Sequence, residues 1–243
     1  MLRFDEPWTL FLEILGGVPN TVSLALASLV LGFVLAVGLA LMRLSPWKPV
    51  AWLAYAYVYF FRSTPLLVQI FLIYYGTGQF EGLRESWAWP FFREAYWCAM
   101  LALTLNTTAY TSEIIRGGLQ AVPWGQVEAA KACGMNAILR LRRVIFPQAI
   151  RQALPGYGNE IVLMVKSTSL ASTITLLEIT LIARKDASST YTLDALVIAA
   201  AIYLFINLLA TRGVAWLEYR LSPELREARI LKALPDPGLS HVH

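Results

Sequence analysis

The feature that most constrains this chain is an apolar run from Thr21 to Met42 that contains no charged residue. An α-helix needs about 20 mostly apolar residues to cross the hydrocarbon core of a bilayer, and this run is long enough. Only 15% of the chain is charged, whereas soluble domains average about 25%. The run and the composition together predict an integral membrane protein.

Four further segments are apolar enough to be membrane helices. Taken in order with the first, the five segments lie near 21–42, 51–76, 95–115, 157–182 and 194–217. They predict an all-α membrane protein with five transmembrane helices. A polar stretch from Arg62 to Pro65 interrupts the second segment, and the fourth contains Lys166 and Glu178.

The positions of lysine and arginine predict the orientation, because these residues favour the cytoplasmic side of a membrane. With the N-terminus outside, the segments 43–51, 116–155 and 212–243 are cytoplasmic and hold 13 of the 20 basic residues. The opposite orientation would reverse that bias. The sequence therefore predicts an extracytoplasmic segment 1–20, a transmembrane domain 21–217 and a cytoplasmic tail 218–243.

Residues for metal or histidine chemistry are scarce in this chain. The two histidines lie in the last three residues, and the predicted topology puts Cys98 and Cys133 on opposite sides of the bilayer. We therefore expect no metal site and no cofactor in the chain. An intramembrane hydrolase would need a Ser/His, Asp/Asp or metal constellation, and none is visible. The net charge is +4, but the positions of the basic residues are explained by membrane orientation. No nucleic-acid partner is therefore expected.

The predicted cytoplasmic loop 116–155 carries the most distinctive pattern. Pro123 suits the first turn of a helix, and the alanines around Ala129 give that helix a slim face that another protein can approach closely. Gly134 permits a sharp turn before a basic segment, 139–143. Two interpretations remain open from this pattern alone: a helix that contacts a partner protein, or an amphipathic helix that rests on lipid headgroups.

The spacing Glu128-Ala129-Ala130-x-x-x-Gly134, followed by Val144-x-Phe146-Pro147, is similar to the EAA loop of ATP-binding-cassette import permeases. The family pattern has Ile and Leu where this chain has Val144 and Phe146, and both changes keep the apolar character. The resemblance implies a type I importer permease fold with a cytoplasmic coupling helix that seats in a groove of an ATPase. The coupling residues that it implies are Glu128, Ala129, Ala130, Gly134 and Pro147.

Three further runs resemble the polar amino-acid branch of these permeases. They are Arg62 to Gln69, Asn106 to Tyr110, and Gly158 to Glu160 with Lys166 to Leu170. The nearest resemblance is to the histidine/lysine/arginine/ornithine and opine permease group. It implies a multi-pass protein of the bacterial inner membrane that works with a second homologous permease subunit, a dimer of cytoplasmic ATP-binding subunits and an extracytoplasmic amino-acid-binding protein.

The chain lacks the Gly-x-x-x-x-Gly-Lys-Ser/Thr loop that binds nucleotide phosphates. We therefore expect a transport subunit and not an enzyme, with ATP and Mg bound by the partner ATPase. A passive channel or membrane scaffold is a rival function, but it would not need a coupling loop. Within the importer class, the alternative is a permease for other polar amino acids, of the glutamine or glutamate type.

Polar residues inside the predicted helices are candidates for cargo contacts, because such residues are costly in lipid and usually face a cavity or a partner. Asn106, Tyr110 and Glu113 share one face of the third helix. Contacts between helices are an equally good explanation for such residues. The predicted substrate-binding residues are Glu160, Asn159, Gln69, Asn106, Leu163 and Met164.

Glu160 is the central candidate, because a carboxylate is the natural partner of a guanidinium or ammonium group. Permeases of this branch that carry neutral amides tend to have Gln at the matching position, so the resemblance implies a basic amino acid or a related opine as cargo. The competing interpretation is a structural ion pair between Glu160 and Lys166 or Arg62. Arg62 is itself open to two interpretations, binding a substrate carboxylate or capping a helix break before Pro65.

Overall fold

A computed structural model describes residues 7–221, and every regular element within that range is helical, in agreement with the predicted all-α class. In chain order the elements are α1 (Pro7–Leu15), α2 (Val18–Arg43), α3 (Lys48–Ser63), α4 (Leu66–Phe71), the π-helix η1 (Leu72–Gly76), α5 (Glu81–Arg84), α6 (Trp89–Phe92), α7 (Ala95–Gln120), α8 (Trp124–Ala132), α9 (Ala137–Arg140), the π-helix η2 (Leu141–Ile145), α10 (Phe146–Ser167), the 3₁₀-helix η3 (Thr168–Ile174), α11 (Ile179–Thr190) and α12 (Asp194–Leu221). Most of the expected tail 218–243 and the first six residues of the expected segment 1–20 lie outside the described range.

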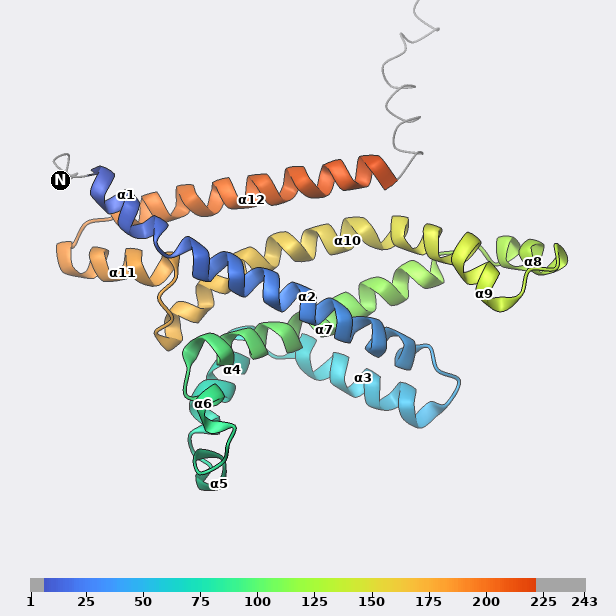
Figure 1. Ribbon diagram of the computed structural model, residues 1–243, viewed down its shortest axis with the longest axis horizontal. Coiled ribbons are helices and arrows are strands. Elements are labelled where there is room, and N and C mark those ends of the chain that lie inside the picture. The colour runs from blue at the N-terminus through green and yellow to red at the C-terminus, as the bar shows by residue number, and fades with distance from the viewer. Residues whose placement is uncertain (1–6, 222–243) are drawn as a thin grey trace, which may run out of the picture.

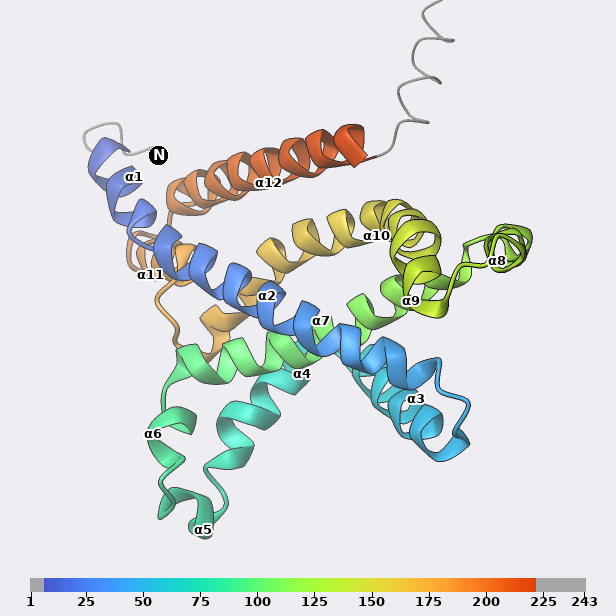
Figure 2. The same cartoon turned by 45° about the vertical axis from the view of Figure 1, so that its right-hand side comes forward.

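The helices α2, α7, α10 and α12 run along the long axis of the molecule (Figure 1). One end of this bundle carries α1 and α11, and the other end carries α8 and α9. On one side, α3 and the arm formed by α4, η1, α5 and α6 diverge from each other, as Figure 2 shows from a second direction. The molecule is therefore an elongated bundle with two ends of different construction.

The segment expected as one helix over 51–76 is broken. The axes of α3 and of α4 with η1 meet at 103°. The break falls at Pro65, which lacks a backbone N–H, and Thr64 before it is extended, at φ −109° and ψ 142°. The residue before a proline is excluded from the helical region by steric contact, which is the physical reason for the break.

The predicted loop 116–155 is shorter in the structure than in the prediction. Residues 116–120 continue α7, and residues 146–155 already belong to α10. We expected the fourth helix to begin near 157, after Pro155, yet α10 runs through that proline. A proline inside a helix is tolerated where neighbouring helices and local adjustments satisfy the freed backbone groups.

The predicted fourth helix, 157–182, was also wrong at its far end. α10 ends at Ser167, the chain tightens into η3, and Thr175 takes a left-handed conformation at φ 66°. Glu178, which we expected inside the helix, instead caps the N-terminus of α11, where its carboxylate accepts hydrogen bonds from the backbone N–H groups of Thr180 and Leu181 at 2.9 and 2.8 Å. A carboxylate in that position satisfies donors that the helix leaves unpaired.

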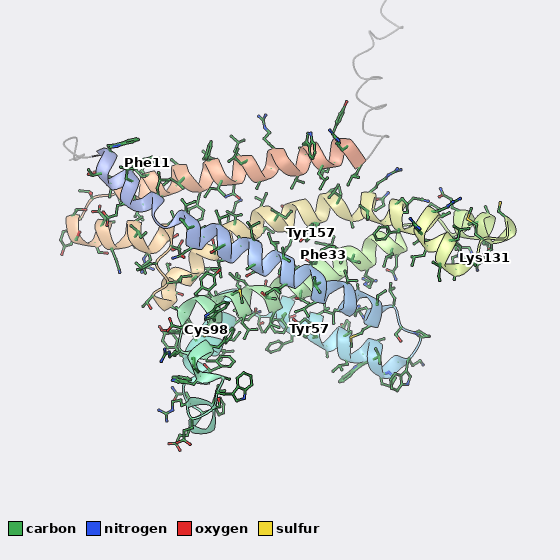
Figure 3. The ribbon with its side chains drawn as sticks, in the orientation of Figure 1. Phe11, Phe33, Tyr57, Cys98, Lys131 and Tyr157 are labelled. Atoms are coloured by element: carbon green, nitrogen blue, oxygen red, sulfur yellow. The ribbon has the colours of Figure 1, made fainter. Side chains whose placement is uncertain are left out.

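The main core lies where α2 packs along α7, with α4, α10 and η3 against them. Small residues permit this close packing, since a Cβ at Gly32 would lie 2.3 Å from Cγ2 of Thr107. Aromatic side chains join the flanking helices: the rings of Phe33 and Tyr157 are 5.3 Å apart between α2 and α10 (Figure 3). The Tyr57 hydroxyl donates a hydrogen bond of 2.9 Å to the Leu105 carbonyl, which ties α3 to α7.

A second, separate core joins α1, α11 and the first half of α12. Its buried members include Ile14, Ile179 and Ile202. Gly17 makes the approach possible, because a Cβ there would lie 2.5 Å from the backbone nitrogen of Ile179. The first helix of the described chain, α1, therefore packs against the first half of its last helix, α12.

Two continuous helical stretches within 7–221, Trp8–Arg43 and Asp194–Leu221, are long and apolar enough to cross a membrane. Two bent pairs, Lys48–Ser63 with Leu66–Gly76 and Ala137–Ile174 with Ile179–Thr190, pass the same test only as broken spans. The expected third span, now α7, does not pass, because polar residues interrupt its apolar run. The count of five spans stays a prediction.

Candidate functional site

The break between α3 and α4 leaves backbone carbonyls without helical partners, and Gln69 satisfies them. Its Nε2 donates to the carbonyl of Phe61 at 3.0 Å, and to the carbonyl and the hydroxyl of Thr64 at 3.1 and 2.8 Å. The Gln69 side chain is buried, at 3% exposure. The break is therefore a defined corner with its polar groups paired.

A cavity of about 450 Å³ lies beside this corner, bounded by the end of α3, the start of α4, α7 and α10. Its lining residues are Arg62, Ser63, Thr64, Pro65, Leu66, Asn106, Tyr110, Glu160, Leu163, Met164 and Ser167. The cavity brings together three runs of sequence that lie far apart in the chain.

Glu160 forms part of the cavity wall and is itself only 7% exposed. Its Oε1 accepts a hydrogen bond of 2.7 Å from the hydroxyl of Thr107, which lies 3.4 Å from the hydroxyl of Thr111. Within residues 7–221, no basic group comes within 4.0 Å of its carboxylate, so the alternative ion pair with Lys166 or Arg62 does not form. A buried carboxylate without a cationic partner, placed in a cavity wall, is suited to a cationic ligand.

Asn106 lines the same cavity, and Gln69 fixes the position of its amide group. Because the Gln69 Nε2 faces carbonyls, its Oε1 must face the other way, and it accepts a hydrogen bond of 3.0 Å from Nδ2 of Asn106. The same Nδ2 lies 3.4 Å from the Phe61 carbonyl. The Asn106 Oδ1 is then left without a hydrogen bond inside the described part of the chain, and it can accept one from a ligand.

Four of the six predicted substrate-binding residues line the cavity, and two do not. Glu160, Asn106, Leu163 and Met164 all line the cavity. Gln69 does not line it and reaches it only through Asn106. Asn159 is exposed and is not brought to the cavity, because the residue next to Glu160 on a helix points about 100° away.

The predicted set of substrate-binding residues did not include Tyr110, Ser63 or Ser167, although each lies in one of the runs that resemble the amino-acid permeases and all three line the cavity. Tyr110 lies under the guanidinium of Arg62, whose central carbon is 5.2 Å from the ring centroid. Pro65 was the signal that pointed to this corner, since a broken helix inside a membrane segment exposes backbone and side chains to a cavity.

A second cavity of about 360 Å³ adjoins the first and shares Arg62, Ser63 and Tyr110 with it. Glu113 lines it and is bound by two arginines, Arg43 at 3.1 Å and Arg116 at 2.6 Å. This ion-pair group joins the end of α2 to α7. The third-helix stripe predicted from Asn106, Tyr110 and Glu113 therefore faces these two cavities.

The predicted coupling residues lie at the end of the molecule that carries α8 and α9. Glu128 is exposed on α8 and accepts a hydrogen bond of 2.8 Å from Nε1 of Trp124. The ammonium of Lys131, labelled in Figure 3, lies 5.1 Å from the centroid of the Trp124 ring. Trp124 itself is 66% exposed, so α8 presents a fixed aromatic ring flanked by one charge of each sign.

The other predicted coupling residues lie on α8, in the turn that follows it, and at the start of α10. Ala129 is exposed and Ala130 is buried, so only Ala130 packs against the rest of the chain. Gly134 has φ +74°, a conformation that glycine adopts without strain, and its N–H bonds the Lys131 carbonyl at 2.9 Å. Pro147 lies in the first turn of α10, where its missing N–H is not needed.

No group of three or more His, Cys, Asp or Glu side chains within the described range 7–221 could hold a metal ion. The cavity offers a carboxylate, an amide oxygen, hydroxyls and a guanidinium, which can bind a polar organic molecule.

Residues 28–223 match the sequence pattern of the family described as the binding-protein-dependent transport system inner membrane component. The chain belongs to this family. Its members are transport subunits and not enzymes, as the missing phosphate loop led us to expect. The family also makes the chain a membrane protein.

Among curated members of the binding-protein-dependent transport family, the octopine transport system permease protein OccM of Rhizobium meliloti is 57% identical over 237 residues, covering 97% of each chain. The histidine/lysine/arginine/ornithine permease HisM of Salmonella typhimurium is 43% identical over 193 residues, covering 79% of this chain and 82% of that protein. The predicted resemblance to this permease group is confirmed.

A solved structure of an amino acid ABC transporter with histidines matches with a TM-score of 0.80 and 34% identity, over 90% of this chain and 99% of that one. The type I permease fold implied by the EAA resemblance is therefore confirmed at the level of the fold.

Proposed function

We propose that this chain is one transmembrane subunit of an ATP-driven importer for basic amino acids or opines, and that the cavity beside Glu160 holds the cargo. The main support for this proposal is the Glu160 carboxylate, which is buried in the cavity wall and accepts a hydrogen bond from the Thr107 hydroxyl. The relatives are named for octopine and for histidine, lysine, arginine and ornithine, which supports a cargo with a cationic side chain.

The cavity has the size and surfaces that such a cargo needs. Its volume of about 450 Å³ falls within the roughly 300–1,000 Å³ of typical small-molecule sites. Glu160 and the Oδ1 of Asn106 would accept hydrogen bonds from the cationic group, while Leu163 and Met164 supply apolar surface for its methylene groups. Gln69 would act as a positioning residue, because it fixes which end of the Asn106 amide faces the cargo.

The topology that we propose has five spans, with the N-terminus outside and the C-terminus in the cytoplasm. The spans are α2, the broken pair of α3 with α4 and η1, then α7, α10 and α12. In this arrangement α8 lies on the cytoplasmic side and is the coupling helix. Its exposed Trp124 and Glu128 would contact a partner ATPase that binds ATP and Mg.

Three kinds of partner follow from this assignment. A second permease subunit, most simply a homologue in a heterodimer, would complete a pathway that one chain encloses poorly. The permease would lie in the bacterial inner membrane, and an extracytoplasmic binding protein would deliver the cargo to it. Closure of the ATPase dimer would move α8 and change which side of the membrane the cavity faces. A glutamine- or glutamate-type importer fits less well, because a buried carboxylate disfavours a neutral or anionic side chain.

The test is the substitution Glu160→Gln in the complete importer, reconstituted in proteoliposomes with its partner subunits and binding protein. Glu85→Gln, on the exposed arm, is the matched control for loss of one carboxylate. We expect arginine uptake to fall at least tenfold for Glu160→Gln, with assembly unchanged, and to be normal for Glu85→Gln. Normal arginine uptake by the Glu160 variant would refute the assignment.

A further inference from the structure

The segment that leads from α8 back into α10 exposes apolar side chains. Ile138 is 79% exposed, Leu141 49% and Phe146 55%. The side chain of Asn136 accepts a hydrogen bond of 2.9 Å from the backbone N–H of Leu139, so the segment begins as a capped helix and not as a loose loop. Contiguous exposed apolar surface of this kind marks a contact with a membrane or with another protein.

The π-helix η2 brings these apolar side chains onto one face. The N–H of Phe146 bonds the carbonyl of Leu141, five residues earlier, and this places the two residues one above the other. An ordinary α-helix would turn them about 140° apart. Ile138 lies one turn before Leu141, whose N–H bonds the Ile138 carbonyl. The wider turn therefore makes a continuous apolar face that an α-helix would divide.

Positive charge accompanies this face without an acidic partner. From Ala129 to Asn159 the chain has five basic residues and no acidic one. Arg142 and Arg143 are exposed on η2, and within residues 7–221 their side chains make no hydrogen bond or ion pair. The Nε of Arg140, just before them, is buried and has no hydrogen-bond partner in that range either. This local excess of positive charge attracts an anion. The exposed residues that form what we call the η2 surface are Ile138, Leu141, Arg142, Arg143 and Phe146.

The neighbouring parts of the molecule indicate that a membrane supplies this anion. The connection between α2 and α3 lies at the same end of the molecule as α9 (Figure 1). Trp47 in that connection and Trp52 in α3 are 67% and 69% exposed, and tryptophan is enriched at the headgroup level of a bilayer. η2 continues directly into α10, so its arginines lie where a long helix leaves the bundle. Basic residues just beyond a membrane helix, beside exposed apolar ones, are typical of segments that bind anionic lipids.

We propose that the η2 surface binds an anionic phospholipid of the cytoplasmic leaflet. Its two arginines pair with the phosphate of the headgroup, and its apolar face enters the boundary between headgroups and acyl chains. This inference rests on the proposed topology, which puts this end of the molecule in the cytoplasm. The exposed side of α8 stays free for the partner ATPase, so the two halves of the cytoplasmic loop have different partners.

The lipid contact also determines where α8 lies. Nε2 of Gln148, in the first turn of α10, donates a hydrogen bond of 2.5 Å to Oε1 of Gln126 on α8 and one of 2.9 Å to the Val144 carbonyl. α8 is therefore tied to the segment that touches the lipid. An anionic lipid at the η2 surface fixes the distance of α8 from the membrane, and uptake becomes dependent on the headgroups of that leaflet.

The experiment titrates the complete importer in detergent with phosphatidylglycerol, which is anionic, or with phosphatidylcholine, which has no net charge. Native mass spectrometry gives the affinity of the complex for each lipid. One variant combines Arg142→Gln with Arg143→Gln, and another is Ile138→Ser. The matched control combines Arg184→Gln with Lys185→Gln, which removes two adjacent exposed charges from α11. Uptake is measured in parallel in liposomes of phosphatidylcholine with and without phosphatidylglycerol.

We expect the wild type to bind phosphatidylglycerol about tenfold more tightly than phosphatidylcholine. The double arginine variant should lose about fivefold in affinity for phosphatidylglycerol for each charge removed, with its affinity for phosphatidylcholine unchanged. Ile138→Ser should weaken the binding of both lipids, because it removes apolar contact and no charge. The control pair should change neither affinity. Phosphatidylglycerol should raise uptake by the wild type and by the control pair, but not by the double arginine variant.

Equal affinity of the wild type for the two lipids would overturn the inference, and this result needs no variant that folds. Equal weakening by the control pair would show that any exposed basic charges attract the lipid, and unchanged binding by Ile138→Ser would show that a phosphate group suffices. Loss of the ATPase from the double arginine variant, with lipid binding retained, would assign the η2 surface to the ATPase instead. Failure of the proposed function has a separate signature, because normal arginine uptake by Glu160→Gln would leave the lipid affinities as they are.

Discussion

Gly118 lies where α7 crosses α10, and the crossing leaves no space for a side chain. A Cβ at this position would lie 2.6 Å from the backbone oxygen of Ala149 and 2.9 Å from the Cβ of Ala153. Ordinary van der Waals contact begins near 3.4 Å, so alanine at 118 would force the two helices roughly 0.8 Å apart. A backbone carbonyl, unlike the end of a side chain, cannot rotate away from this contact.

The neighbouring Gly117 is the matched control for Gly118→Ala, because a Cβ there would meet nothing within 4 Å. Both glycines lie in α7, so both alanine variants gain about the same helix propensity, up to about 1 kcal/mol. The difference in unfolding free energy between the two variants therefore reports only the packing at Gly118. Overpacking of this kind costs about 1–3 kcal/mol, so we expect Gly118→Ala to be less stable than Gly117→Ala by that amount.

The assay is unfolding of the assembled importer in detergent by stepwise addition of a denaturing surfactant, followed by tryptophan fluorescence. ATP-driven uptake is measured in parallel, because α7 leads into α8 after only three residues and a shift of its end would be transmitted there. Equal stability and equal uptake of the two variants would show that α7 and α10 accommodate the added methyl group without loss of stability. The packing argument would then be wrong.

Two further predictions concern the α11 cap and the proposed orientation. Glu178 is fully buried and accepts hydrogen bonds from two backbone N–H groups and from the Tyr203 hydroxyl at 2.7 Å. Glu178→Gln turns an N–H towards one of these donors, so we expect a loss of about 1–3 kcal/mol in unfolding experiments, and an unchanged melting curve would contradict the role of the cap. Cys133 is exposed at the end of α8 and Cys98 is buried, so a membrane-impermeant maleimide should label the native chain once, at Cys133, and only in inside-out vesicles. Labelling of right-side-out vesicles would reverse the proposed topology.

Sequence patterns were most informative where one residue type has one physical effect. The uncharged run after Thr21 belongs to α2, and Pro65 marked the corner that frames the cavity. Glu160 could be singled out because a carboxylate within an apolar segment needs a reason. Gly134 has the positive φ that its place after a short helix suggested.

Other features depend on contacts between distant segments, and no local pattern contains them. Gln69 was expected to touch the cargo, but its partners are carbonyls freed by the break one turn earlier. Glu178 was placed inside a helix, because its role as a cap depends on the left-handed turn at Thr175. The start of α10 was placed too late in the chain, because Pro155 predicts a helix boundary unless the surrounding helices support the backbone.

The second core has a consequence for how the chain is made. Ile14 emerges early from the ribosome, but the groups that bury it, around Ile179 and Ile202, are synthesised after most of the remaining chain. Until then α1 has no permanent neighbour and must rely on lipid or a chaperone to shield its apolar face. Completion of the last helix is therefore the step that secures the first one, and a chain that stops short of α12 is exposed to quality-control proteases at its opposite end.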